Sequence, residues 1–407
     1  SILSHRPDKA RLLLLYVHDA CRVSGRCTGE RHHEYSQCIY GRYHPSEARM
    51  VALVAPAMET QTQVMRHLPK VAVVILNWNG RFFLEKFLPS VYNSDYPNVE
   101  FIVGDNGSTD DSVAFVTENF PSVRVVRNDR NLGFAGGYNA VLKRVDADYF
   151  VLLNSDVEVT PNWISPVIEL LESQPDMAAA QPKIRSYYQR DRFEHAGAAG
   201  GFIDQYGFPF CRGRLLHIVE PDNGQYDDPC EVFWASGAAF FIKRKCWEEV
   251  GGFDADFFAH MEEVDLCWRL RLAGYRIGYC PNAVVYHVGG GTLATSNPRK
   301  TYLNFRNSLY MMQKNLPFAR ACWVIFARMW IDLVALFHFL FQAKWGDAWA
   351  ISRAHQRFFV DFFLTAKKRR RNVPPVDGSG IYRGSFIWAF YVGGRKYFRH
   401  LDRRRFR

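Results

Sequence analysis

Residues 70–156 alternate between continuous apolar runs and segments in which apolar residues recur every three or four positions. The apolar runs cover residues 71–78, 99–106, 123–128 and 147–156, and the first of them is rich in β-branched residues. Strands that are apolar throughout are typical of a parallel sheet covered on both faces, and the spacing between them is typical of helices. The pattern therefore predicts the α/β class, with a mostly parallel sheet flanked by helices and a Rossmann-like half.

Three of these runs end in polar residues. The polar ends are residues 77–79, 105–106 and 154–156. In open α/β sheets, ligands bind outside the carboxyl ends of the strands. We therefore expect these side chains to converge on one edge of the sheet and to form a site there.

Residues 157–315 have a more mixed pattern. Helical spacing is found over residues 163–173 and over residues 262–273, where Gly274 is a suitable C-cap. Residues 232–244 have the composition of a strand. Residues 275–291 predict a strand, a turn and a second strand that leads into a glycine loop.

The chain becomes strongly aromatic after Pro317. Residues 319–343 consist mainly of Trp, Phe, Ile, Leu and Val, but they include Arg320, Arg328, Asp332, His338 and Gln342. A charge at the centre of a bilayer costs at least about 2.5–3.5 kcal/mol, which argues against a simple membrane span. We expect one or two amphipathic helices in a membrane interface, with the basic run 367–371 on the headgroups. The alternative is a soluble helical packing domain.

The first 64 residues lack any sustained period. Their Cys and His residues follow no zinc-site spacing, so we expect a disordered or spurious extension, with the natural chain starting near Met65. The expected organisation is an atypical extension over 1–67, a catalytic domain over 68–316 and an amphipathic, basic region over 317–407.

Composition and charge exclude several classes of protein. A hydrophobic content of 48% with 23% charged residues excludes collagen-like and disordered chains, and nine Cys without dense spacing fit a reducing compartment. The net charge is +10, yet residues 366–407 alone hold thirteen Lys or Arg and two Asp. The rest of the chain is therefore nearly neutral, and the tail suits a polyanion such as anionic lipid or nucleic acid.

Two common nucleotide-binding motifs are absent from the sequence. The first apolar run leads into Asn-Trp-Asn-Gly rather than G-x-G-x-x-G, and there is no Walker A sequence. The glycines at 133–137 follow the third run and match neither motif. NAD-binding and P-loop functions are thus excluded, although the sheet still suits a nucleotide.

Acidic residues lie where they can support chemistry. Asp156, at the end of the fourth run, can ligate a divalent cation, and His287 can complete the site. Glu262, Glu263 and Asp265 open a helix, where acids complement the helix dipole but one of them can also act as a general base.

In this order, the sequence stretches resemble the inverting family 2 glycosyltransferases of the GT-A fold, and within them the bacterial rhamnosyltransferase-like members. The matching stretches are VVILNWNG (73–80), VGDNGSTDDS (103–112), NLGFAGGYN (131–139), VLLNSD (151–156), WASGAAFFIKR (234–244), VGGFDADFF (250–258), MEEVDLCWRLRLAGYRI (261–277), AVVYHVGGG (283–291) and RNSLYMMQKN (306–315).

The resemblance implies a role for each matching residue. The nucleotide sugar is contacted by Leu76, Asn77, Trp78, Asp105, Asn131, Gly133, Asn154 and Asp156. Asp156 and His287 match the metal ligands, although Asn154 replaces the first acid of the usual metal motif. Trp234, Ser236 and Gly237 match the acceptor-side loop. Glu263 matches the catalytic base, which is usually Asp, and Glu262 remains an alternative.

The resemblance also implies the reaction. A Mg²⁺- or Mn²⁺-assisted direct displacement would move a sugar, rhamnose or a similar one, from a dTDP- or UDP-linked donor to a hydroxyl of a glycan or lipid-linked acceptor in surface polysaccharide synthesis. The protein would lie peripherally on the cytoplasmic face of the cell membrane and would not bind nucleic acid. The alternatives are a nucleotidyltransferase and a catalytically degenerate polyanion-binding protein.

Overall fold

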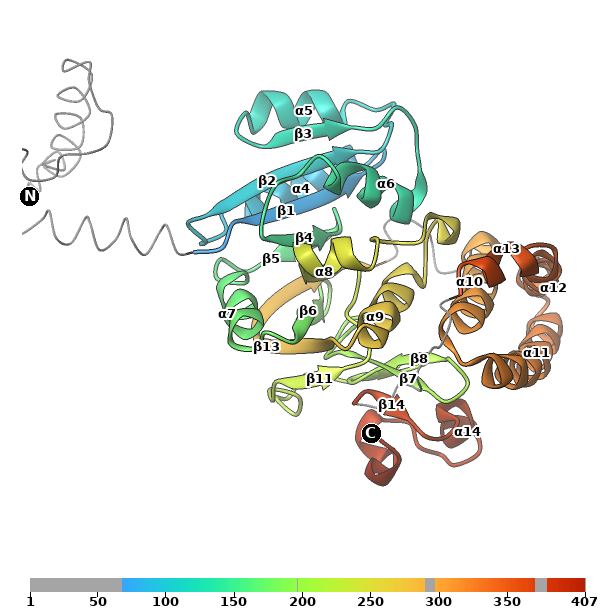
Figure 1. Cartoon of the computed structure of the whole chain (residues 1–407). Coiled ribbons are helices and arrows are strands. Elements are labelled where there is room, and N and C mark those ends of the chain that lie inside the picture. Colours follow the sequence, from blue (N-terminus) through green and yellow to red (C-terminus); the bar gives the residue numbers. More distant parts are fainter. Residues whose placement is uncertain (1–67, 196, 290–296, 370–378, 407) are drawn as a thin grey trace, which may run out of the picture. The chain divides into compact units, whose positions relative to one another are not determined.

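A nine-stranded mixed sheet lies at the centre of the computed structural model, which describes residues 68–195, 197–289, 297–369 and 379–406 (Figure 1). The strand order is β11-β13-β6-β12-β4-β1-β2-β3, and β5 pairs with β13. Leu68–Arg407 forms one compact unit. The expectations for residues 1–67, for the glycine loop from residue 290 and for residues 370–371 of the basic run lie outside the described residues.

The first half of the sheet is parallel. Strand β1 pairs in parallel with β2 and β4, and β2 pairs in parallel with β3. The strands are β1 (Val71–Asn77), β2 (Val99–Asp105), β3 (Arg124–Arg127) and β4 (Tyr149–Leu153). The helices between them are α4 (Arg81–Tyr92), α5 (Ser112–Asn119) and α6 (Gly133–Leu142). The alternation of buried strands with helices predicted from the sequence is confirmed here.

The second half of the sheet mixes directions. Strand β12 runs antiparallel to β4 and β6, whereas β13 runs parallel to β6. The strands are β5 (Val157–Val159), β6 (Met177–Ser186), β11 (Cys230–Val232), β12 (Ala239–Lys243) and β13 (Arg276–His287). The single strand expected over 232–244 is therefore divided between β11 and β12. The turn expected within 275–291 is a register shift between Cys280 and Val284, inside one continuous strand.

The sheet separates two hydrophobic cores. Because successive side chains of a strand point to opposite faces, Val71, Val73 and Ile75 lie in one core, and Ala72 and Val74 lie in the other. The first core is covered by α4, α5 and α7 (Ser165–Ser173), and the second by α6, α8 (Arg244–Glu249) and α9 (Glu262–Leu272). Both faces of the sheet are thus buried, and only its edges and strand ends are open for a ligand.

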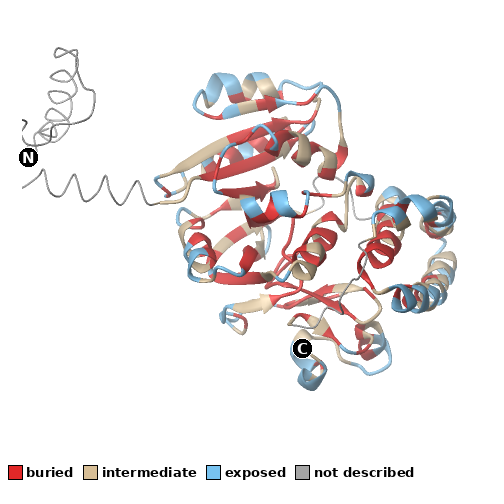
Figure 2. Ribbon diagram, in the orientation of Figure 1, coloured by how far each residue is buried: buried red, intermediate tan, exposed pale blue. Residues whose placement is uncertain are grey.

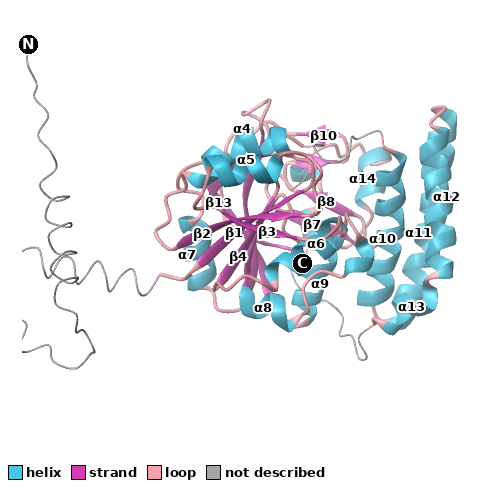
Figure 3. Ribbon diagram, turned by 90° about the horizontal axis from the view of Figure 1, so that it is seen from above, coloured by secondary structure: helices cyan, strands magenta, loops and turns pink. Residues whose placement is uncertain are grey.

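The remaining elements form a small sheet and a group of helices. The small sheet has the order β10-β9-β8-β7-β14, from β7 (Gly201–Asp204), β8 (Pro209–Cys211), β9 (Arg214–Leu215), β10 (Ile218–Val219) and β14 (Ile381–Tyr382). The helices are α10 (Pro298–Asn315), α11 (Phe318–Phe341), α12 (Trp345–Val360), α13 (Phe362–Lys367) and α14 (Phe386–Tyr391), with 3-10 turns at Ala255–Phe257, Phe398–His400 and Arg403–Arg405. Helices α10, α11 and α12 pack side by side at one end of the unit (Figure 3). Residues 319–343, expected to hold one or two amphipathic helices, lie mostly in the single helix α11.

Candidate active site

The ends of β1 and β2 present two buried acceptor atoms. The Asn77 side chain donates through Nδ2 to Ser108 Oγ (3.2 Å) and Ser112 Oγ (2.9 Å), and its Oδ1 is buried with no hydrogen-bond partner in the described chain. The Asp105 side chain is 1% exposed and accepts through Oδ1 from the Ser108 N–H (3.2 Å). Its Oδ2 makes no hydrogen bond with the described residues and lies 3.7 Å from Arg127 Nε. These oxygens can accept N–H or O–H groups, as a nucleobase or a ribose would offer.

The residues flanking Asn77 differ in exposure. Trp78 is 50% exposed, so one face of its indole is open to a ligand. Leu76 is partly buried against the position of Gly137, where an added Cβ would lie 2.9 Å from Leu76 Cδ2. Leu76 therefore packs behind the strand-end site, and Trp78 lies at its solvent-exposed edge.

The loop at Asn131–Gly133 is fixed by Asn106, a residue to which the sequence assigned no individual role. Asn106 Nδ2 donates to Asn131 Oδ1 (3.1 Å) and to the Gly133 carbonyl (3.0 Å), and Asn106 Oδ1 accepts from the Leu132 N–H (3.2 Å). Gly133 has a φ of 74°, and an added Cβ would lie 2.7 Å from the Phe258 carbonyl oxygen. Only glycine fits this position without strain.

Asp156 and His287 meet because of strand pairing. Strand β5 pairs antiparallel with β13 so that Val157 lies opposite His287, which brings the preceding residue, Asp156, beside the imidazole. His287 Nε2 lies 3.1 Å from Asp156 Oδ1, and both side chains are almost fully buried. The structure thus joins two residues that are far apart in the sequence.

Glu194 contacts the other side of the same imidazole and was not identified from the sequence. Its Oε2 lies 3.1 Å from His287 Nδ1. Burial alone would lower the pKa of His287, but the carboxylates of Asp156 and Glu194 outweigh it and raise the pKa to about 10. A carboxylate on Nδ1 also fixes the ring orientation, as is usual for a histidine that ligates a metal.

The pair Asp156–His287 fits a divalent cation only with help from the substrate. No group of three or more His, Cys, Asp or Glu in the described ranges is arranged to hold a metal ion. Asn154 lies nearby, with Nδ2 3.4 Å from His287 Nε2, but its amide carries no charge. Two protein ligands suit a cation such as Mg²⁺, which commonly completes its coordination with phosphate oxygens and water.

Glu262 and Glu263 lie in the first turn of α9 without full pairing; Glu262 is buried and Glu263 is partly buried. Each has an Oε2 atom that is buried and has no hydrogen-bond partner among the described residues. Burial raises the pKa of Glu262 well above its ordinary value, and the nearby Glu263 and Asp265 raise it further. Burial also raises the pKa of Glu263 to about 7. A carboxyl group with such a pKa can take up a proton near neutral pH, as a general base must.

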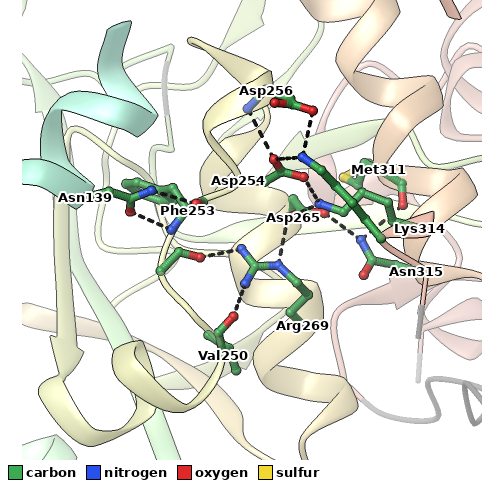
Figure 4. Close-up of polar contacts among 12 residues, drawn as sticks. Asn139, Val250, Phe253, Asp254, Asp256, Asp265, Arg269, Met311, Lys314 and Asn315 are labelled. Carbon is green, nitrogen blue, oxygen red and sulfur yellow. Dashed lines mark hydrogen bonds and ion pairs between the residues drawn. The ribbon is translucent and has the colours of Figure 1, made fainter. Parts of the chain in front are cut away.

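Asp265, in the same helix, is saturated with partners (Figure 4). Its Oδ2 accepts from Arg269 Nε (2.8 Å) and Lys314 Nζ (3.0 Å), and its Oδ1 accepts from Asn315 Nδ2 (2.8 Å). Burial alone would raise the pKa of Asp265, but Lys314 and Arg269 outweigh it and lower the pKa. Asp265 therefore remains charged and anchors α9 to α10.

Helix α10 also holds the loop that leads into α9. The Asn307 Nδ2 atom donates to the carbonyl oxygens of Phe257 (2.9 Å), Ala259 (2.9 Å) and His260 (2.7 Å). The same loop accepts from α6, because the Phe134 N–H donates to the Phe258 carbonyl (2.7 Å). The candidate base is thus positioned by two helices. Helix α10 carries many polar residues, so its sequence gave no signal that singled out Asn307 for this role.

The expected acceptor-side residues divide into two groups. Ser236 and Gly237 lie beside the end of β4, since the following residue, Ala238, accepts through its carbonyl from the Asn154 N–H (3.0 Å). Trp234 is buried instead in the small sheet, where its indole N–H donates to the Phe202 carbonyl (2.9 Å). The structure brings Ser236 and Gly237 to the strand-end edge, whereas the Trp234 ring packs away from it.

Residues 72–246 match the family model described as Glycosyl transferase family 2. The N-acetylglucosaminyl-diphospho-decaprenol L-rhamnosyltransferase of Mycobacterium tuberculosis is 29% identical over 235 residues, which cover 53% of this chain and 75% of the relative. The O-antigen biosynthesis protein RfbC of Myxococcus xanthus is 23% identical over 261 residues, which cover 63% of this chain and 20% of that protein. Among solved structures, a mannosyltransferase from Pyrobaculum calidifontis in complex with GDP-Man and Mn²⁺ matches with a TM-score of 0.46 and 14% identity, covering 82% of each chain. The family match and the curated relatives confirm the resemblance that the sequence motifs carry, together with the enzyme class and the mixed α/β, GT-A-like fold.

Proposed function

Because residues 72–246 belong to glycosyl transferase family 2 and this chain is a glycosyltransferase, we propose that it transfers a sugar with inversion from a nucleotide-diphosphate donor to a hydroxyl group. The observation that carries this proposal is the pair of buried, unpartnered oxygens on Glu262 and Glu263. A single direct displacement requires one base and no enzyme nucleophile. Glu263, whose pKa burial raises to about 7, can act as that base.

The donor binds along the strand ends. Asn77 Oδ1 and Asp105 Oδ2 accept hydrogen bonds from the base and ribose, and the half-exposed Trp78 lies at the rim of this subsite. The loop Asn131–Gly133, locked by Asn106, closes the nucleotide side. A uridine or thymidine diphosphate sugar, with rhamnose or a similar sugar, is the donor class that we propose.

Asp156 and His287 are the residues that would hold Mg²⁺ or Mn²⁺ next to the donor diphosphate, with Asn154 beside them. When bound, the cation would stabilise the negative charge that develops on the leaving diphosphate. Glu194 keeps the His287 ring in the orientation in which Nε2 faces Asp156.

Glu263 performs the proton transfer. Its carboxylate removes the proton from the acceptor hydroxyl, and the acceptor oxygen attacks the anomeric carbon on the face opposite the diphosphate. The new carbon–oxygen bond forms while the bond to the phosphate oxygen breaks, and the electron pair leaves with the nucleoside diphosphate. The configuration inverts. Glu262 is the second candidate for the base, since it is 4% exposed and its Oε2 atom also has no hydrogen-bond partner among the described residues.

The acceptor is a glycan or a lipid-linked glycan of surface polysaccharide. The similarity to a protein named as a decaprenol-diphosphate rhamnosyltransferase supports this class. Ser236 and Gly237 would line the acceptor side, and Trp234 would stiffen the segment by its bond to Phe202. We propose a peripheral position on the cytoplasmic face of the cell membrane, with no nucleic-acid partner.

A panel of sugar nucleotides with Mg²⁺ or Mn²⁺ tests the proposal by the release of nucleoside diphosphate. Glu263→Gln and Asp156→Ala should each abolish release, whereas Asp111→Asn, at an exposed acid near the site, should not. Full activity in both site variants would reject the assignment. Release of pyrophosphate instead would favour a nucleotidyltransferase. Salt-sensitive binding to a polyanion without any turnover would favour the degenerate alternative.

A further inference from the structure

Helix α11 exposes a continuous apolar stripe. Its members are Trp323, Phe326, Trp330, Val334, Phe337 and Phe341, with exposed fractions between 54% and 90%. At 100° per residue they fall within an arc of about 80° on the helix surface. We name these six side chains the aromatic face of α11. Half-exposed side chains of this size present on the order of 500 Å² of apolar surface, which in a monomer marks an interaction site.

Two charged residues in the middle of α11, Arg328 and Asp332, point away from the aromatic face. Arg328 and Asp332 lie about 140° and 180° around the helix from Trp323, and both are nearly fully buried. Arg328 donates to the Tyr206 carbonyl (3.2 Å) and lies 3.6 Å from the Phe208 ring centroid. Asp332 Oδ2 lies 3.1 Å from His355 Nε2 on α12. Arg328 and Asp332, two of the residues predicted to interrupt this apolar segment, therefore hold α11 on neighbouring elements and leave the aromatic face free of their charge.

These contacts determine how α11 can meet a bilayer. In the described part of the chain, α11 is the one helix long and apolar enough to cross a membrane, with a mean hydropathy of 1.9 and 22% of that window buried. To cross, it would have to leave Tyr206 and His355 and carry Arg328 and Asp332 into hydrocarbon. An orientation parallel to the membrane surface keeps both contacts and buries only the aromatic face.

The charge around the aromatic face favours lipid over protein. Arg320, one turn before the stripe, and Lys344, just after α11, are exposed. A second copy of this chain would place like charges against one another, whereas anionic headgroups would pair with them. Trp side chains also prefer the level of the headgroups.

We propose that the aromatic face of α11 is a membrane-docking surface that lies in the plane of an anionic bilayer. The proposal deepens the proposed function, because an acceptor held on a lipid would then be met at the membrane surface. Figure 2 shows that exposed residues follow α11 and α12 along the same end of the molecule. Exposed Trp345 and Trp349 at the start of α12 extend the apolar surface.

Vesicle co-sedimentation of the full chain tests the surface. We expect binding to vesicles of phosphatidylcholine with phosphatidylglycerol, and weaker binding to phosphatidylcholine alone. The double variant Trp330→Glu with Phe337→Glu should bind at least about tenfold less. Tyr188→Glu, which changes a side chain that is 73% exposed on another part of the protein, should bind like the unchanged chain. Unchanged thermal unfolding of the double variant shows that it is folded.

Several outcomes would overturn the proposal. Equal binding of the double variant and the unchanged chain would show that another surface docks. A concentration-dependent dimer that the double variant abolishes, without vesicle binding, would assign the face to a second copy. Fluorophores on cysteines introduced at positions 323 and 341 should lie at equal depth, and unequal depths would indicate a span.

Transfer to a water-soluble acceptor separates the two proposals. Vesicle binding without any sugar transfer would reject the proposed function but keep the docking surface. Transfer that proceeds in a protein that does not bind vesicles would reject the surface alone.

Discussion

Two groups of carboxylates in the first turn of α9 share their burial but differ in their partners. Glu262 and Glu263 have oxygens without hydrogen-bond partners among the described residues, and burial raises their pKa values. Asp265 is at least as buried, yet Lys314, Arg269 and Asn315 bind it and its pKa falls. Burial alone therefore does not identify a catalytic carboxylate; the supply of cations and donors decides between proton transfer and structural support.

The largest expected effect is on catalysis by Glu263. Glu263→Gln removes the proton acceptor while keeping the size of the side chain. We expect the turnover rate to fall by about 10²- to 10⁴-fold, with little change in donor affinity. Measured rates of nucleoside diphosphate release check this, and Glu263→Asp should keep part of the activity. If Glu262→Gln is inactive and Glu263→Gln is not, the base is Glu262.

A substitution among the partners of Asp265 should lower the stability of the fold instead. Lys314→Met leaves Asp265 and Asp254 buried with one cation fewer, and breaking a buried pair costs about 3–5 kcal/mol. Urea unfolding measures this loss, and Lys143→Met on an exposed site is the control. A variant as stable as the unchanged chain would show that Lys314 contributes little, and the contrast between the two groups would fail.

A smaller effect is expected at Glu194. Glu194→Gln keeps the shape of the side chain but removes the charge that orients His287. We expect the affinity for Mn²⁺ in the presence of nucleoside diphosphate to fall by about 10- to 100-fold, as read by electron paramagnetic resonance. Glu158→Gln, whose partner is Arg190 on the surface, should leave the affinity unchanged. Equal affinities in both variants would remove Glu194 from the site.

The smallest effect concerns pH. A base works only when it is ionised, so a pKa raised to about 7 makes kcat/KM fall about tenfold per pH unit below neutrality. At saturating metal, Glu262→Gln should leave this acid limb where it is, because burial and the neighbouring Glu263 and Asp265 already favour the neutral form of Glu262. If kcat/KM of the unchanged enzyme falls only near pH 4.5, the pKa of Glu263 is not raised.

The sequence was a sufficient guide where local pattern determines structure. The parallel half of the sheet and the polar ends of β1, β2 and β4 followed from runs of β-branched residues. Strand β6 was missed because its run Met-Ala-Ala-Ala-Gln-Pro lacks such residues and contains a proline. The break between β11 and β12 was missed because residues 232–242 are apolar except for the small residues Ser236 and Gly237.

The roles of the acids could not be predicted in the same way. Asp265 differs from Glu263 through Lys314 and Asn315, which lie about fifty residues further along the chain. Glu194 reaches His287 because β6 pairs with β13 and a bridge joins Arg185 of β6 to Phe193. These partners depend on tertiary contacts, and a single sequence does not reveal such contacts.

The contacts that anchor α9 to α10 limit where this enzyme can be truncated or recombined. The family match ends at residue 246, whereas α9 begins at Glu262 and its anchors on α10 extend to Asn315. A chain shortened at the end of the match would retain Asn77, Asp105 and Asp156 but would lose Glu262 and Glu263, the proposed proton acceptors, and the helix that immobilises them. A recombinant protein that carries this domain as a working unit must therefore include the chain through the end of α10.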